Sequence, residues 1–124
     1  MQPCSILLVD DDLSLLEVVK TLLESKGHPV TAVVDGTQAL AALEKGSFNL
    51  VLTDVFFPGR DGVEVIIERS KSNPATRIIA MSGSGKFSSD HYLLLVKKLG
   101  ADLILKKPFG AAELFAAIDQ AFAI

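Results

Sequence analysis

Five short apolar runs alternate with five longer amphipathic segments, and this alternation restricts the fold more than any other feature of the sequence. The runs 5–9, 29–34, 49–53, 77–81 and 102–105 predict strands, and the segments 13–25, 36–45, 63–71, 91–99 and 111–122 predict helices. In the last helix, the residues expected to face the sheet are Leu114, Phe115, Ile118 and Phe122. Parallel strands need crossover connections, so this order predicts an α/β fold in three layers: a doubly wound parallel sheet of five strands in the order 2-1-3-4-5.

The composition fits a single domain over residues 1–124. Hydrophobic residues make up 49% of the 124 positions, which is enough for a substantial core. The net charge of −3 and the scattered basic residues argue against a nucleic-acid surface. The single cysteine, Cys4, fits a reducing compartment, and the chain has neither a membrane-spanning run nor a secretory signal. We therefore expect a cytoplasmic protein that contacts neither nucleic acid nor membrane.

The third apolar run ends on one acid, Asp54. The residues before it suit a strand that is buried on both faces, whereas Pro58, Gly59, Asp61 and Gly62 mark a turn soon after it. Ligands of open α/β sheets bind at the carboxyl edge, which is where Asp54 would emerge. Taken alone, Asp54 could equally cap a turn, so its role depends on the residues at the ends of the other strands.

Polar residues come after three more strands at the same edge. Asp10 and Asp11 follow the first strand, Ser82 the fourth and Lys107 the fifth. The switch point between strands 1 and 3 would bring the two acids beside Asp54. Two carboxylates about 4 Å apart repel by roughly 4 kcal/mol at an effective dielectric near 20, so the cluster needs a cation. Oxygen ligands favour Mg²⁺ or a similar hard cation, and Lys107 can neutralise part of the charge.

Each of these residues also has an ordinary interpretation. The acids at 10–12 could simply favour the start of a helix, Lys107 could be a surface lysine, and a hydroxyl such as that of Ser82 is common after a strand. Their joint position at four strand ends is what indicates a site. A carboxylate nucleophile, a metal, a lysine and a hydroxyl suit phosphoryl transfer, with Asp54 attacking phosphorus and the others stabilising the phosphoryl oxygens.

Four stretches carry a family resemblance: ILLVDDD at 6–12, LVLTDVFFPGRDG at 50–62, IIAMSG at 78–83 and GADLILKKPF at 100–109. With them the chain resembles, over essentially its whole length, the CheY-like receiver domains of bacterial two-component response regulators. The resemblance implies that Asp54 is the phosphoacceptor and that Ser82 and Lys107 contact the phosphoryl group. It also implies Mg²⁺ ligands at Asp10, Asp11, Asp54 and the backbone carbonyl of Phe56, and a cis peptide bond between Lys107 and Pro108.

The same resemblance implies a signalling role in a phosphorelay rather than that of a turnover enzyme. The phosphoryl group would come from a sensor histidine kinase or a phosphotransfer protein, and the only chemistry would be self-catalysed phosphoryl transfer and hydrolysis at Asp54. A downstream protein partner would then read the phosphorylated state. Because no output domain follows, we expect a single-domain regulator, unless the chain is a piece of a longer protein.

Three departures from the family pattern affect how the signal would leave the site. Ile104 stands where an aromatic switch residue is common, the loop after Ser82 is longer than usual and glycine-rich, and Phe56 puts a bulky apolar residue at the rim. An isoleucine cannot swing a ring into a vacated space. We therefore expect the loop 83–90 to carry more of the response, to a partner face made by the fourth helix, the fifth strand and the last helix.

Other interpretations fit less well. The GSGK at 83–86 is not a P-loop, because the required first glycine is replaced by Ala80 and residue 87 is Phe. A flavodoxin-like FMN protein would share the topology but would not need three acids. Phosphatases with an aspartyl nucleophile use a second Asp where this chain has Phe56. An interaction domain with a vestigial site remains the alternative, and Mg²⁺ binding would distinguish it.

Overall fold

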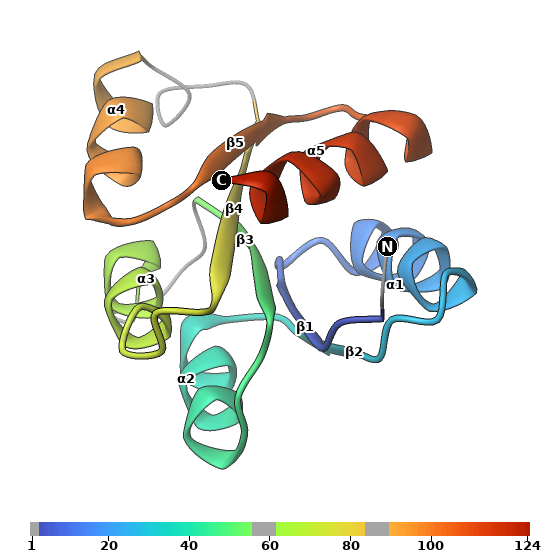
Figure 1. Ribbon diagram of the computed structural model, residues 1–124, viewed down its shortest axis with the longest axis horizontal. Helices are drawn as coiled ribbons and strands as arrows, with labels where there is room; N and C mark the ends of the chain where they lie inside the picture. Colours follow the sequence, from blue (N-terminus) through green and yellow to red (C-terminus); the bar gives the residue numbers. More distant parts are fainter. Residues whose placement is uncertain (1–2, 56–61, 84–89) are drawn as a thin grey trace.

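A five-stranded parallel sheet with helices on both faces forms the protein (Figure 1). The structure is a computed structural model that describes residues 3–55, 62–83 and 90–124. The strands are β1 (Ile6–Val9), β2 (Val30–Val33), β3 (Leu50–Asp54), β4 (Arg77–Ser82) and β5 (Leu103–Lys106). The helices are α1 (Leu13–Ser25), α2 (Gly36–Lys45), α3 (Val63–Ser70), α4 (Asp90–Leu99) and α5 (Ala111–Ala123).

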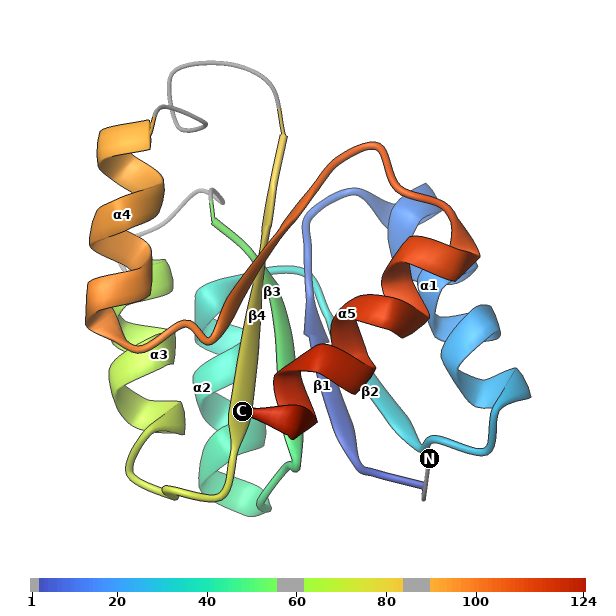
Figure 2. The same cartoon turned by 45° about the horizontal axis from the view of Figure 1, so that its top comes forward.

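The sheet has the strand order β2-β1-β3-β4-β5, so the predicted α/β fold and its strand order are confirmed. β1 pairs with both β2 and β3, and the direction in which successive strands are added to the sheet changes at this point. Figure 2 shows α1 and α5 on one face of the sheet and α2, α3 and α4 on the other. The carboxyl ends of β1 and β3 therefore lie side by side at one edge, which is the position expected for a ligand site.

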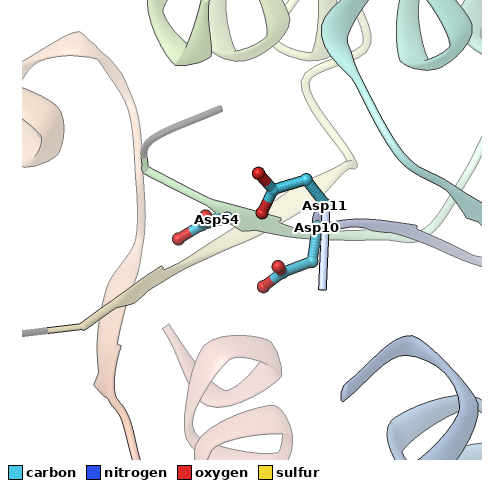
Figure 3. Close-up of side chains that lie close together, drawn as sticks. All are labelled: Asp10, Asp11 and Asp54. Carbon is cyan, nitrogen blue, oxygen red and sulfur yellow. The ribbon is translucent and has the colours of Figure 1, made fainter. Parts of the chain in front are cut away.

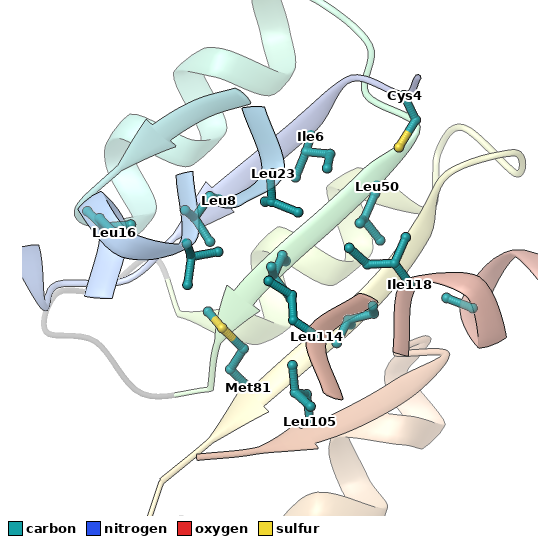
Figure 4. Packing of buried hydrophobic residues seen from close by; sticks show 14 residues of the cluster. Cys4, Ile6, Leu8, Leu16, Leu23, Leu50, Met81, Leu105, Leu114 and Ile118 are labelled. Atoms are coloured by element: carbon teal, nitrogen blue, oxygen red, sulfur yellow. The ribbon is translucent and has the colours of Figure 1, made fainter. Parts of the chain in front are cut away.

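Alternation along the strands divides the core into two clusters. On β1, Ile6 and Leu8 face α1 and α5, whereas Leu7 and Val9 face the other three helices. Figure 4 shows the first cluster, with Leu114 and Ile118 of α5 packed against the sheet. Burying a leucine or isoleucine side chain completely contributes about 1.5–3 kcal/mol, and every residue of β1 and β3 is buried. The strands that present the acids are thus fixed on both faces.

The last turn of α5 differs from the expectation. Leu114 and Ile118 are buried as predicted, but Phe122 is 38% exposed and Ala121 takes the buried position. Arg77, the first residue of β4, donates from Nε to the carbonyl of Ala121 at 3.2 Å. The helix therefore reaches the amino-terminal edge of the sheet at this turn, where Phe122 is partly exposed to solvent. Among the described residues, no helix is both long and apolar enough to span a membrane.

Candidate functional site

Asp54 is the last residue of β3, at the carboxyl edge of the sheet. It is only 8% exposed, and it lies in register with Met81 of β4. The sequence predicted that this strand would end one residue earlier, at 53. The strand includes Asp54 because pairing with β4 continues beyond it: the backbone N–H of Val55 donates to the carbonyl of Met81 at 3.1 Å. The Val55 N–H also donates to Oδ1 of Asp54 at 3.0 Å. The carboxylate is therefore held by its own strand end.

Asp10 and Asp11 follow β1 and converge on Asp54 (Figure 3). One carboxylate oxygen from each of the three residues lies within 4.8 Å of the others. Asp10 is 1% exposed, whereas Asp11 is exposed to solvent. The structure thus brings together the three acids that the sequence predicted, with one deep and one accessible carboxylate beside Asp54.

Asp12 has a different role. It is the N-cap of α1, and its side chain accepts hydrogen bonds from the backbone N–H groups of Ser14 and Leu15. Its own backbone N–H donates to Oδ1 of Asp10 at 3.0 Å, which helps to fix that carboxylate. The helix-start interpretation of the acids therefore holds for Asp12 alone.

Lys107 connects the fifth strand to the acids. Its Nζ lies 2.6 Å from Oδ2 of Asp10 and 3.4 Å from Oδ1 of Asp54. Its backbone N–H donates to the carbonyl of Ser82 at 2.7 Å, which ties the segment after β5 to the end of β4. The Lys107–Pro108 peptide bond is cis, as predicted. One partly buried ammonium group thus contacts two buried carboxylates and compensates them only in part.

The charges at this edge shift the pKa values of both partners. Burial, and then repulsion from Asp10, raises the pKa of Asp54 from 3.8 to about 6, against the opposing attraction of Lys107 and the Val55 hydrogen bond. Burial lowers the pKa of Lys107, but its hydrogen bond to Asp10 and the two negative charges outweigh this and raise the pKa overall. Asp54 is therefore a carboxylate that gains from a further cation nearby.

Ser82 ends β4 at the same edge and is 2% exposed. The prediction placed it one residue after the strand; it belongs to the strand because it pairs in register with Lys106. Phe56, and with it the expected carbonyl ligand, lies outside the described residues, as does the segment 84–89 of the expected switching loop. Sequence reasoning missed the Val55 N–H as a partner of Asp54, because a backbone donor leaves no trace in residue type.

The donor set of the cluster fits a hard divalent cation. All three ligand groups are carboxylates, which Mg²⁺ prefers over nitrogen and sulfur ligands. A deep Asp10 paired with Lys107 and an exposed Asp11 leave the cluster accessible from solvent on one side. The arrangement could hold a metal ion directly against the Asp54 carboxylate.

Comparison with known proteins identifies the class of this fold and site. The family model for the response regulator receiver domain matches residues 6–119, which is most of the chain. The chain therefore belongs to the receiver domain family of two-component response regulators, and the predicted resemblance is confirmed. Such domains act in signalling through a phosphoacceptor.

Individual relatives give the same assignment. The chain is 40% identical over 114 residues to the Haemophilus influenzae protein named "Transcriptional regulatory protein CpxR homolog", a match that covers 91% of this chain and 48% of that protein. A CheY-like receiver domain protein from Methanospirillum hungatei has a TM-score of 0.87 at 29% identity, covering 98% and 95% of the two chains. A solved structure described as the BeF3-activated DrrB receiver domain has a TM-score of 0.84 at 27% identity, covering 99% and 100%.

The chain spans about half the length of the curated relatives it matches. Those relatives are named as transcriptional regulatory proteins, and the name applies to their full length. The expectation that residues 1–124 contact no nucleic acid therefore stays a prediction.

Proposed function

We propose that Asp54 of this receiver domain accepts a phosphoryl group from a sensor histidine kinase or a phosphotransfer protein, with Mg²⁺ bound at Asp10 and Asp11. The observation that carries the proposal is the position of Lys107 Nζ, between Asp10 and Asp54 at 2.6 and 3.4 Å. A buried pair of carboxylates that served only for stability would be costly, because desolvation of the charges offsets their attraction to the lysine. A phosphoryl group and its metal use all of these charges.

The chemistry depends on the carboxylate of Asp54. One of its oxygens attacks phosphorus, and the phosphorus–nitrogen bond of a phosphohistidine breaks, with its electron pair leaving on the imidazole. An acyl phosphate such as acetyl phosphate loses acetate in the same way. The Lys107 ammonium and the Ser82 hydroxyl donate to the phosphoryl oxygens as their charge develops. Bound Mg²⁺ would neutralise charge on the same oxygens.

Pre-placement of the donors supports this role for Lys107. Its backbone is tied to Ser82 and its side chain to Asp10, so little reorganisation is required before phosphoryl oxygens arrive. The raised pKa of Asp54 is consistent with this role, because the negative charge of its carboxylate is only partly compensated in the free protein. Addition of the metal supplies the missing positive charge.

The surface of α4 supports an output face formed by α4, β5 and α5. Leu94, Leu95 and Leu99 are large apolar side chains that remain 39–54% exposed on this helix. An apolar surface of this kind is suited to a protein partner. Signal transmission to this face, and the part of the loop after β4 in it, remain predictions from the sequence.

Phosphorylation can be tested on the intact chain. Incubation with acetyl phosphate and Mg²⁺, followed by mass measurement of the whole protein, is expected to give one phosphate adduct in wild type and none in Asp54→Asn. Asp119→Asn, which removes an exposed carboxylate on α5, should keep the adduct. If wild type forms no adduct, or if Asp54→Asn keeps it, the proposal is wrong. The vestigial-site alternative predicts no adduct and no response to Mg²⁺.

A further inference from the structure

The start of α4 is hydrogen-bonded to the residue next to the phosphoacceptor. Tyr92, in the first turn of α4, donates from its hydroxyl to the backbone carbonyl of Val55 at 3.0 Å. Val55 directly follows Asp54 and is 4% exposed. The bond joins residues that are 37 positions apart in the chain. It therefore connects the end of β3 to a helix of the face that we propose for output.

Val55 relays this connection to the carboxylate itself. Its N–H donates to Oδ1 of Asp54 at 3.0 Å, while its carbonyl accepts from Tyr92. Both polar groups of this buried residue are thus engaged: the N–H is shared between Asp54 Oδ1 and the carbonyl of Met81, at 3.1 Å, and the carbonyl accepts from α4. If Asp54 accepted more weakly, the Val55 N–H would be left to the Met81 carbonyl alone, and the backbone that presents the carbonyl to Tyr92 would be free to shift.

The phenol also lies within the electrostatic field of the site. Burial raises the pKa of Tyr92, and the charges of Glu64 and Asp54 raise it further. The ring packs against the core cluster beneath α2, α3 and α4, together with Ile104 of β5. Tyr92 is therefore an aromatic residue on this side of the sheet whose hydroxyl lies within the field of Asp54, while position 104 carries an aliphatic side chain.

We propose that Tyr92 is the positioning residue that couples the state of Asp54 to α4, through its hydrogen bond to the Val55 carbonyl. This rests on the proposed function, because it takes phosphorylation of Asp54 as the input. Phosphorylation converts the carboxylate into an acyl phosphate, and the negative charge moves from the carboxyl oxygens to the phosphoryl oxygens. The Asp54 oxygen then accepts more weakly from the Val55 N–H. The Val55 N–H shifts toward the Met81 carbonyl, the bond from Tyr92 to the Val55 carbonyl weakens, and the first turn of α4 is released.

Hydrogen exchange of α4 amides, residues 90–99, tests this in the full chain. Loss of one hydrogen bond of ordinary net strength raises the equilibrium constant for local opening of a helix about fivefold. In wild type, beryllofluoride with Mg²⁺ should speed exchange in α4 by about that factor. In Tyr92→Phe, exchange should already be fast in the free protein and should change little on addition of beryllofluoride. Acetyl phosphate should still label Asp54 of this variant at the wild-type rate.

A matched control separates coupling from loss of stability. Thr76 is buried, and its hydroxyl donates to the carbonyl of Phe48 at 2.7 Å, away from the acids. Thr76→Val therefore removes a bond of the same type and should keep the full α4 response. Tyr92 is also the single tyrosine in a chain without tryptophan, so protein fluorescence reports it directly. Its emission should change on beryllofluoride binding in wild type and stay constant in Asp54→Asn.

The inference is overturned if α4 of Tyr92→Phe responds to beryllofluoride as wild type does. It is also overturned if both variants lose the response equally, or if beryllofluoride leaves or slows α4 exchange in wild type. In each of these cases a phosphate adduct on Asp54 leaves the proposed function standing. Absence of any adduct in wild type would instead remove the proposed function and this inference with it.

Discussion

Lys107 is held more closely by Asp10 than by Asp54: its Nζ lies 2.6 Å from Oδ2 of the first and 3.4 Å from Oδ1 of the second. Asp10 is almost fully buried, so this charge-assisted hydrogen bond compensates the carboxylate that has least access to water. The interaction of the Lys107 ammonium with Asp54 is longer and weaker, and the pKa of Asp54 stays raised to about 6. Asp54, the residue that we expect to react, is therefore the acid whose negative charge is less fully compensated by Lys107.

Asp54→Asn should stabilise the metal-free protein at neutral pH. The pKa of Asp54 is about 6 in the folded protein and ordinarily 3.8, so the folded state keeps this proton where the unfolded chain has lost it. The free energy of unfolding therefore falls as the pH rises from 3.8 to about 6. The ionised carboxylate should cost the folded state about 3 kcal/mol at neutral pH.

Urea unfolding without divalent metal, at a series of pH values, measures this difference. The stability of wild type should decline relative to Asp54→Asn across that interval and remain lower above it. Asp119→Asn is the control, since its carboxylate is exposed on α5 and should leave the pH profile of wild type unchanged. Parallel profiles for wild type and Asp54→Asn would show that burial of Asp54 carries no such cost.

Replacement of Lys107 by methionine should destabilise the protein at neutral pH. The change keeps an unbranched side chain but leaves Asp10 and Asp54 buried without a cation, which should cost about 2–4 kcal/mol. The deficit should shrink at low pH, where the carboxylates take up protons. The control is Lys97→Met, because Lys97 is an exposed lysine in the last turn of α4. Thermal or urea unfolding compares the stability of the two variants with that of wild type. Equal stability of the two variants would contradict the pairing.

Mg²⁺ should stabilise wild type and should stabilise Asp11→Asn less. A cation that binds the folded protein alone contributes about 1.4 kcal/mol at ten times its dissociation constant. Asp11 is exposed, so Asp11→Asn removes a ligand and one repelling charge with little loss of packing. Its stability without metal should therefore equal or exceed that of wild type. Thermal unfolding over a Mg²⁺ series decides the point, and identical responses of the two proteins would count against the metal site.

The fold and the positions of the acids could be predicted because each depends on a pattern along the chain. Buried strands give continuous apolar runs, and strict alternation with helices favours the doubly wound order 2-1-3-4-5, which places Asp10 and Asp54 together. The same pattern could not distinguish Asp12 from its neighbours. That distinction depends on the N-cap geometry of α1, in which the Asp12 side chain turns to the helix N–H groups.

Contacts that cross the fold through backbone groups left no pattern to interpret. Val55 carries no functional group in its side chain, yet its N–H and carbonyl link Asp54 to Tyr92. Tyr92 lies in an apolar helical segment, where its ring is expected to be part of the core and its hydroxyl partner depends on tertiary packing. The exposure of Phe122 likewise depends on where α5 passes the end of the sheet, which periodicity does not encode.

The most direct test of the central claim is to locate the phosphoryl group. Borohydride reduces an acyl phosphate to an alcohol, so a phosphorylated aspartate becomes homoserine and can be found by peptide mass spectrometry. After treatment with acetyl phosphate and Mg²⁺, the account predicts homoserine at position 54, dependent on Mg²⁺ and absent without the phosphodonor. Homoserine at Asp10 or Asp11 instead, or at none of the three acids, would contradict it.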